Sequence, residues 1–460
     1  MIKFFITSTI KLKKNTTYYI ILFVIISFCS LISYENLTFN LYFNNLYADY
    51  AKFFSTLDYS SFTYSNNIFP IWGYGLIHLL GKNILVTLIL QQTFTFINLI
   101  LLDRLILKYK LIDNIHLFRL VILLSSTWFL FHTQMWPKSI ASNLLLLGII
   151  LLIKYIKSSK NSMLIYSAIC FGLLHNFRSD YIYLSVVIMV LLLLWDKFNL
   201  KKLQFIFIQI IFLIPWMLFT YNQTGTPLLN STNAGHVLFI GLGQLPNNIW
   251  GITPYDKDPL KQEVLVDKFG DKYKYIDYAE WNGIKEDKYL KKVFFDFIKK
   301  NPKEWVRKCL FASRLLVLDP FYVGNVGNFQ QNKISNINEI REIEALFYSF
   351  NFSEISSLIK NTSWEINLKE LSQLMVTIYT KIFGIIVFMS FLFIFLITFL
   401  HNILKRTFYN RLEQLLGLII LYQMSISIFA FHMPVYNSSV YIFYPLLSYL
   451  LFQKYLSIKQ

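Results

Sequence analysis

Charged residues are scarce in this chain. Only 15% of its 460 residues are Asp, Glu, Lys or Arg, whereas a typical soluble domain has about 25%. A soluble protein of this length needs a charged surface around its core, and too few charges are present to form one. Hydrophobic residues make up 55% of the sequence, and Phe alone occurs 44 times. The composition therefore predicts that much of the surface faces lipid.

Cysteine and acidic residues are also few. The three cysteines are Cys29, Cys170 and Cys309, whose spacing predicts neither a metal site nor a disulfide framework. Against 26 acidic residues stand 43 basic ones, which gives a net charge of +17. These cations occur in short groups between apolar runs, whereas a nucleic-acid-binding domain gathers them on one face. The pattern is typical of cytoplasmic loops in a membrane protein, and no nucleic-acid partner is expected.

Apolar runs of spanning length recur along the chain. The first follows Lys11–Lys14, and its extent from Thr17 to Tyr34 favours an uncleaved span over a signal peptide. The sequence therefore predicts an all-α, polytopic bundle of about ten membrane spans. The predicted spans are residues 17–35, 84–106, 115–131, 139–156, 163–177, 181–195, 203–221, 374–400, 412–431 and 437–453.

The segment Ile68–Leu80 decides the topology. It is short for a span and contains Pro70 and Gly73, which favours a re-entrant or interfacial helix. If it does not cross, both termini are cytoplasmic, and so are the basic groups at residues 11–14, 104–110, 154–160, 197–202, 405–411 and 454–459. If it crosses, most of these groups lie on the wrong side of the membrane.

The predicted topology divides the chain into three parts, placed in the cell membrane with a large extracytoplasmic loop. Residues 1–221 form an N-terminal transmembrane module of seven spans, with a first outer loop at residues 36–82. Residues 222–370 form a mainly helical extracytoplasmic segment, and residues 371–460 form a C-terminal module of three spans.

The first outer loop contains a candidate catalytic acid. Residues 45–57 have the periodicity of an amphipathic helix on the membrane surface, with Asp49 on its polar side. A carboxylate at the membrane interface is partly desolvated, which raises its pKa and makes it a better general base. The alternative is an ordinary solvated acid on a surface helix.

Several short motifs carry a resemblance to a known family. They are Leu46–Ala51, which contains Asp49, then Phe69–Gly75, Asn176–Tyr181, Thr224–Pro227 followed by Ser231–Gly235, and Tyr444-Pro445. In layout and in these motifs the chain resembles the GT-C superfamily of membrane glycosyltransferases. Within it, the chain is similar to the group of dolichyl-phosphate-mannose protein mannosyltransferases and aminoarabinose transferases. The expected fold also includes juxtamembrane helices, which lie at the membrane surface beside the spans.

The resemblance implies an inverting glycosyltransferase. Its donor is a sugar on a polyprenyl phosphate, its acceptor is a glycan, lipid or protein outside the cytoplasm, and membrane lipids surround it. Asp49 is then the catalytic base. Arg178 and Lys138 are the expected ligands of the donor phosphate, because a leaving phosphate needs cations. Further candidate substrate-binding residues are Tyr50, His132, His175 and Asp180.

The chain departs from the family pattern at several points. Tyr50 stands where many members have a second acid, and His132 begins a loop in which metal-dependent members have acids. No metal site and no required cofactor are therefore predicted, and a divalent cation remains an alternative. Two rival functions are a transporter or flippase of lipid-linked sugars and a polymerase or ligase of surface polysaccharide. The near absence of charge within the spans disfavours the transporter.

Overall fold

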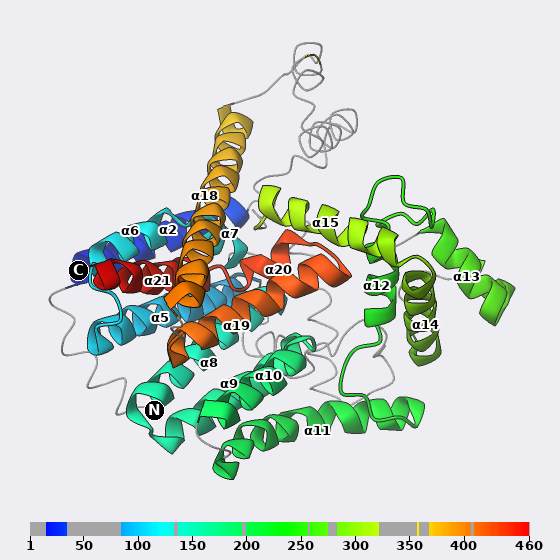
Figure 1. The fold of residues 1–460 in the computed structure, drawn as a ribbon, viewed down its shortest axis with the longest axis horizontal. Helices are drawn as coiled ribbons and strands as arrows, with labels where there is room; N and C mark the ends of the chain where they lie inside the picture. The colour runs from blue at the N-terminus through cyan, green and yellow to red at the C-terminus, as the bar shows by residue number, and fades with distance from the viewer. Residues whose placement is uncertain are drawn as a thin grey trace.

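The computed structural model describes residues 15–34, 84–132, 137–195, 199–255, 258–274, 283–321, 357, 368–405 and 409–459. Every regular element in this part of the chain is a helix, so the predicted all-α class is confirmed there (Figure 1). The first outer loop at 36–82 lies outside the described residues, together with Asp49, Tyr50 and the segment Ile68–Leu80.

Each predicted span contains helix. The N-terminal helices are α2 (Thr16–Tyr34), α5 (Ile84–Tyr109), α6 (Ile115–Leu124), α7 (Ser126–His132), α8 (Pro137–Ser158), α9 (Asn161–Phe177), α10 (Tyr181–Trp195) and α11 (Gln204–Thr224), the last preceded by η3 (Leu200–Leu203). The C-terminal helices are α18 (Leu368–Lys405), α19 (Arg411–Ser425), the π-helical turn η6 (Ile426–Ala430), α20 (Pro434–Ser438) and α21 (Phe443–Lys459).

Five of the described helices are long and apolar enough to cross a membrane. They are Val86–Tyr109, Lys138–Ser158, Leu200–Asn222, Ile378–Lys405 and Arg411–Ala430. Shorter apolar helices are Thr16–Cys29, Ile115–Leu124 and Tyr181–Trp195. Their length and composition indicate a membrane protein, and the bundle of ten spans remains a prediction.

Two of the predicted spans are interrupted. The run at 115–131 breaks at Ser125, whose hydroxyl donates a hydrogen bond to the Val121 carbonyl at 2.6 Å and so competes with the helical backbone bonds. The run at 437–453 is helical at its first two residues, which end α20, and again from Phe443, with turns at residues 439–442 between them. Both breaks coincide with short polar stretches, at residues 125–127 and 437–439, which the apolar residues around them outweigh in a long window.

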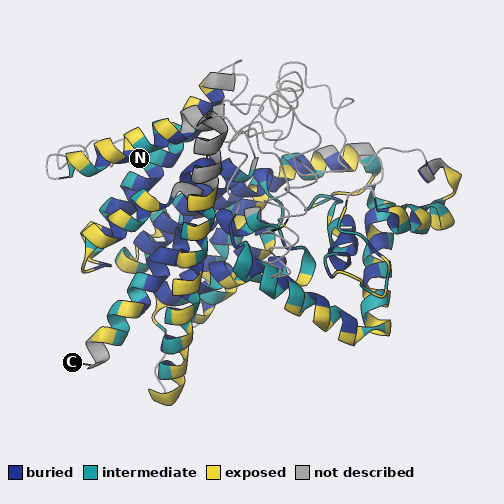
Figure 2. Ribbon diagram, turned by 90° about the horizontal axis from the view of Figure 1, so that it is seen from above, coloured by how far each residue is buried: buried dark blue, intermediate teal, exposed yellow. Residues whose placement is uncertain are grey.

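The main core lies between the apolar helices (Figure 2). Helix α8 is largely enclosed by its neighbours, whereas α11 and α18 expose one side along much of their length. The exposed side of α11 carries large apolar residues, among them Phe207 and Ile211. A bundle that leaves such side chains outside requires an apolar surrounding.

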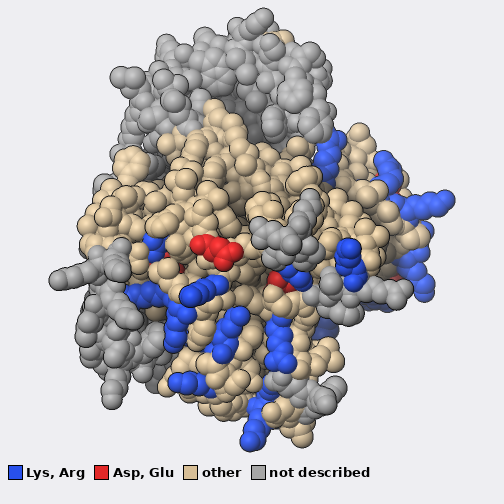
Figure 3. Space-filling model, turned by 60° about the vertical axis from the view of Figure 1, so that its left-hand side comes forward, with Lys and Arg blue, Asp and Glu red and all other residues tan. Residues whose placement is uncertain are grey.

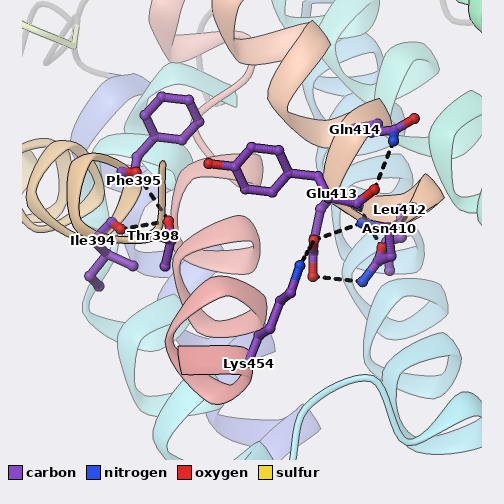
Figure 4. A network of polar contacts seen from close by, with 9 residues as sticks. Ile394, Phe395, Thr398, Asn410, Leu412, Glu413, Gln414 and Lys454 are labelled. Carbon is purple, nitrogen blue, oxygen red and sulfur yellow. Dashed lines mark hydrogen bonds and ion pairs between the residues drawn. The ribbon is translucent and has the colours of Figure 1, made fainter. Parts of the chain in front are cut away.

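Polar contacts join several helix ends at one end of the bundle. Asn410 and Glu413 form a capping box at the start of α19, and Lys454 of α21 lies 3.4 Å from Glu413 (Figure 4). The guanidinium of Arg411 donates to the Trp195 carbonyl at 2.8 Å, which brings the end of α10 to the same place. Figure 3 shows Lys and Arg gathered in the lower part of one face, below a broad region with few charges.

A second, smaller core is built from the long segment after α11. Its helices are α12 (Ala234–Leu242), α13 (Pro259–Phe269), η4 (Asp271–Lys274), α14 (Ile284–Lys300) and α15 (Pro302–Leu318). Phe239, Leu265, Leu290 and Phe294 are buried at its centre. The described part of segment 222–370 is thus mainly helical, as predicted.

Two close contacts fix this second core. A side chain at Gly235 would meet the Asp287 carbonyl oxygen at 2.3 Å, so α12 can lie against α14 only with glycine there. Lys308 of α15 is fully buried and donates to the carbonyls of Ile428 at 3.0 Å and Ala430 at 2.7 Å. These bonds satisfy carbonyls at the π-turn η6 and dock α15 onto the bundle.

Candidate functional site

A cavity of about 940 Å³ lies where the bundle meets the second core. This volume is in the upper part of the range of small-molecule sites. Its lining comes from α8, the α9–α10 turn, the loop before α12, α12 itself, α14, α19, η6 and α20, and includes Lys138, Arg178, Asp180, Asn230, His236, Tyr255, Lys291, Phe295, Tyr422 and Tyr436. Among these described residues, three side chains are basic and one is a carboxylate, and two of the basic groups are paired, Arg178 with Asp180 and Lys291 with Asp287.

Arg178 is held by a carboxylate two residues away. Its backbone ends α9, with the N–H donating to the Leu174 carbonyl at 2.9 Å. Its Nε and Nη2 donate to the two oxygens of Asp180, each at 2.8 Å, and the Tyr422 hydroxyl donates to the Asp180 carbonyl. The ion pair that the sequence allows at this spacing is therefore present. Since it uses Nε and Nη2, the Nη1 edge of the guanidinium takes no part in it.

Lys138 and Arg178 meet at one aromatic ring. The Arg178 Cζ lies 5.1 Å and the Lys138 Nζ 5.2 Å from the centroid of the Tyr436 ring. The aromatic face attracts both cations, which offsets part of their mutual repulsion. A void of about 10 Å³, the size of a single water, is lined by these three residues and by Tyr181. Two cations from different helices are thus held close together at the cavity wall.

Hydrogen bonds around Tyr436 support this arrangement. The Tyr181 hydroxyl lies 2.8 Å from the Ser439 Oγ, which in turn donates to the Tyr436 carbonyl at 2.5 Å. Ser142 of α8 donates to the Ser439 carbonyl at 2.6 Å. The chain after α20 is therefore tied both to α8, which contains Lys138, and to α10, which follows Arg178.

The ion pair stays charged despite its burial. Burial acts against the charge of Asp180, but the Arg178 guanidinium outweighs it and lowers the pKa of the carboxyl below its usual value. Burial also opposes the charge of Arg178, and the Asp180 carboxylate reverses this and raises the pKa of the guanidinium. Both groups are consequently ionised at neutral pH.

The two predicted histidines lie elsewhere. His132 is fully buried at the end of α7, where its Nδ1 lies 3.0 Å from the Asn143 Nδ2. His175 is buried between helices, with its Nε2 2.7 Å from the Gln209 Oε1 and 3.2 Å from the Ser185 Oγ. Neither lines the cavity. The structure therefore brings together the two predicted cations and their carboxylate, and leaves both histidines in the core.

The sequence missed Tyr436, whereas the predicted topology placed His236 on the outer side as a candidate for the lining of a polar cavity. Tyr436 lies far along the chain from both cations, and its position after Pro434 in a short polar stretch was the only available signal. His236 lines the cavity, and its Nδ1 lies 2.9 Å from the Nζ of the buried Lys261. Nothing in the spacing of His236 and Lys261 indicates that they pair.

Across the described ranges, no group of three or more His, Cys, Asp and Glu side chains is placed to hold a metal ion. No family model, curated protein or solved structure matches the chain. The fold and the cavity alone therefore define the class, which is a helical membrane protein with paired cations at one end of its bundle.

Proposed function

We propose that this chain is an inverting membrane glycosyltransferase of the GT-C type, which moves a sugar from a polyprenyl phosphate to an extracytoplasmic acceptor. One observation carries the proposal: Lys138 and Arg178 converge on Tyr436 in the lining of a single large cavity. A planar guanidinium beside an ammonium suits a phosphate, which accepts hydrogen bonds on several oxygens.

The proposed reaction needs few protein groups. An acceptor hydroxyl attacks the anomeric carbon, the bond from that carbon to the phosphate oxygen breaks, and the polyprenyl phosphate leaves with the electron pair. The proton of the hydroxyl passes to Asp49, which lies outside the described residues. Lys138 and Arg178 stabilise the charge on the departing phosphate.

The distribution of charge supports the proposed orientation. The basic helix ends around Arg411 and Lys454 lie at one end of the bundle, and the positive-inside rule assigns such ends to the cytoplasm. The cavity lies at the opposite ends of the same helices, next to the start of α10 and the end of α19. In the proposed arrangement of ten spans, both termini are cytoplasmic and the cavity faces outwards.

A transferase and a flippase of lipid-linked sugars both need an anion site, so binding alone does not separate them. The distinguishing event is the break of the bond between sugar and phosphate. The test therefore supplies membranes that contain the full chain with a panel of radiolabelled polyprenyl-phosphate sugars. It measures the release of polyprenyl phosphate.

Three variants make the test specific. Asp49→Asn removes the proposed base and should abolish release. The double variant Arg178→Gln/Asp180→Asn removes the proposed phosphate ligand without leaving a buried lone carboxylate. It should reduce release about 10- to 100-fold, the usual worth of a charge-assisted hydrogen bond. Arg411→Gln, at the other end of the bundle, serves as the control and should have no effect. Unchanged release in Asp49→Asn would exclude the proposed base.

A further inference from the structure

The cavity has a second wall that the proposed phosphate site does not use. This wall comes mainly from the segment after α11 and contains Asn230, Tyr255, Lys291 and Phe295. It lines the same cavity as Lys138 and Arg178, and its loop before α12 is bonded to α10 through Asn230 and the Tyr183 hydroxyl. In a transferase, the groups that line the donor cavity without binding the phosphate are those that an acceptor meets.

Two aromatic rings on this wall are left open. Phe295 of α14 is 62% exposed and Tyr255 is 69% exposed, although both line the cavity. The Phe295 ring is held in place, because its centroid lies 5.2 Å from that of the buried Phe294 in an edge-on contact. An open apolar ring in a cavity gains free energy when a ligand covers it.

Polar groups stand beside these rings. The Asn230 Nδ2 donates to the Tyr183 hydroxyl at 2.6 Å, while the Asn230 Oδ1 has no hydrogen-bond partner within the described part of the chain. Lys291, paired with Asp287 at 2.5 Å, adds an ammonium group to the same wall.

This combination matches the chemistry of a sugar. A pyranose ring presents a C–H face, which lies against the electron-rich face of an aromatic ring, and hydroxyls at its edges, which bond to amides and ammonium groups. A lipid acceptor would instead desolvate Asn230 and Lys291 without replacing their hydrogen bonds. Resting on the proposed function, we infer that the acceptor is a carbohydrate, bound on the wall formed by Phe295, Tyr255 and Asn230.

Binding is tested without any lipid donor. The full chain in nanodiscs is titrated with a panel of short neutral and acidic oligosaccharides, and affinities are measured by saturation-transfer NMR and thermophoresis. Phe295→Leu, which keeps apolar bulk but loses the aromatic face, should weaken binding about tenfold. Phe295→Tyr, which keeps an aromatic ring, should bind with an affinity close to that of the wild type. Phe207→Leu removes a ring of equal exposure (63%) from α11 outside the cavity and should leave affinity unchanged.

The outcomes separate this inference from the proposed function. Oligosaccharide binding that is weakened in Phe295→Leu and retained in Phe295→Tyr supports a carbohydrate acceptor, even if no donor sugar is ever transferred. Binding to no oligosaccharide, or binding that Phe207→Leu weakens equally, overturns it. Release of polyprenyl phosphate that depends on Arg178 would still stand in that case, because the phosphate site uses other residues, Lys138 and Arg178.

Discussion

Helices α11 and α14 each bury one face against a core but have outer faces of different chemistry. The exposed side of α11 carries Phe207 and Ile211, whereas α14 buries Leu290 and Phe294 and exposes Lys288. Each helix turns one face to a core, so burial alone does not distinguish them. The chemistry of the outer face distinguishes them, because the apolar outer face of α11 suits lipid and the charged outer face of α14 suits water. This contrast separates the bundle from the second core.

Buried charge offers the strongest way to test the stability of the bundle. Arg119 bonds to both oxygens of Asp103, at 2.8 and 2.9 Å, and both side chains are almost fully buried. Arg119→Met should destabilise the protein by about 4 kcal/mol, since it leaves a buried carboxylate unpaired. Thermal denaturation in detergent measures this, and Arg119→Met/Asp103→Asn should recover most of the loss. A double variant no better than the single one would contradict this account of the pair.

A charge placed on each exposed face tests the contrast directly. Ile211→Asp puts a carboxylate on the proposed lipid face of α11. It should make the free energy of membrane insertion less favourable by about 3 kcal/mol. Lys288→Asp on α14 should change stability by less than about 0.5 kcal/mol, because that face is proposed to meet water. A glycosylation-site insertion assay and yield after membrane extraction measure the effects. Equal tolerance at both sites would remove the distinction between the two helices.

The junction between the two regions should respond to pH. His432 is buried there, and Gln244 bonds to both its backbone N–H, at 2.7 Å, and its carbonyl, at 2.9 Å. Burial, with a smaller effect from Lys308, lowers the pKa of His432 from 6.5 to about 4, against the raising effect of a hydrogen bond that the imidazole donates to the Asp319 backbone carbonyl. As pH falls, the His432 imidazole of the unfolded chain is therefore protonated before that of the folded chain. Stability declines as a result between about pH 6.5 and 4.

The size of this effect is at most about 3.5 kcal/mol, because each pKa unit corresponds to about 1.4 kcal/mol. Melting temperature measured across this pH range should fall for the wild type, and His432→Gln should flatten that slope. A slope that is the same in His432→Gln would assign the pH dependence to other groups.

The smallest expected effect concerns packing within the second core. Gly235→Ala would push a methyl group to within 2.3 Å of the Asp287 carbonyl oxygen. The resulting shift of α12 against α14 should cost about 2 kcal/mol, as overpacking usually does. Gly225→Ala is a useful contrast, because a side chain there meets no atom within 4 Å and only its positive φ of 69° causes strain. Limited proteolysis between α13 and α14 reports the loosening, and resistance in Gly235→Ala equal to that of the wild type would contradict it.

Sequence pattern predicted the helices well because apolar runs and helices coincide in this chain. It missed the break at Ser125 and the late start of α21 at Phe443, since the short polar stretches at residues 125–127 and 437–439 are outweighed by the apolar residues around them. The cations Lys138 and Arg178 could be proposed from their places at helix ends. Tyr436, which joins them, could not, because its contact depends on how α20 packs against α7, α19 and η6.

The proposed function depends most on phosphate binding between Lys138 and Arg178. An experimental structure of the full chain with a polyprenyl-phosphate sugar tests this directly. The phosphate should lie within about 4 Å of both the Lys138 Nζ and the Arg178 guanidinium, the reach of an ion pair. A phosphate bound instead at the basic helix ends near Arg411 and Lys454 would contradict the proposed site and the orientation of the bundle.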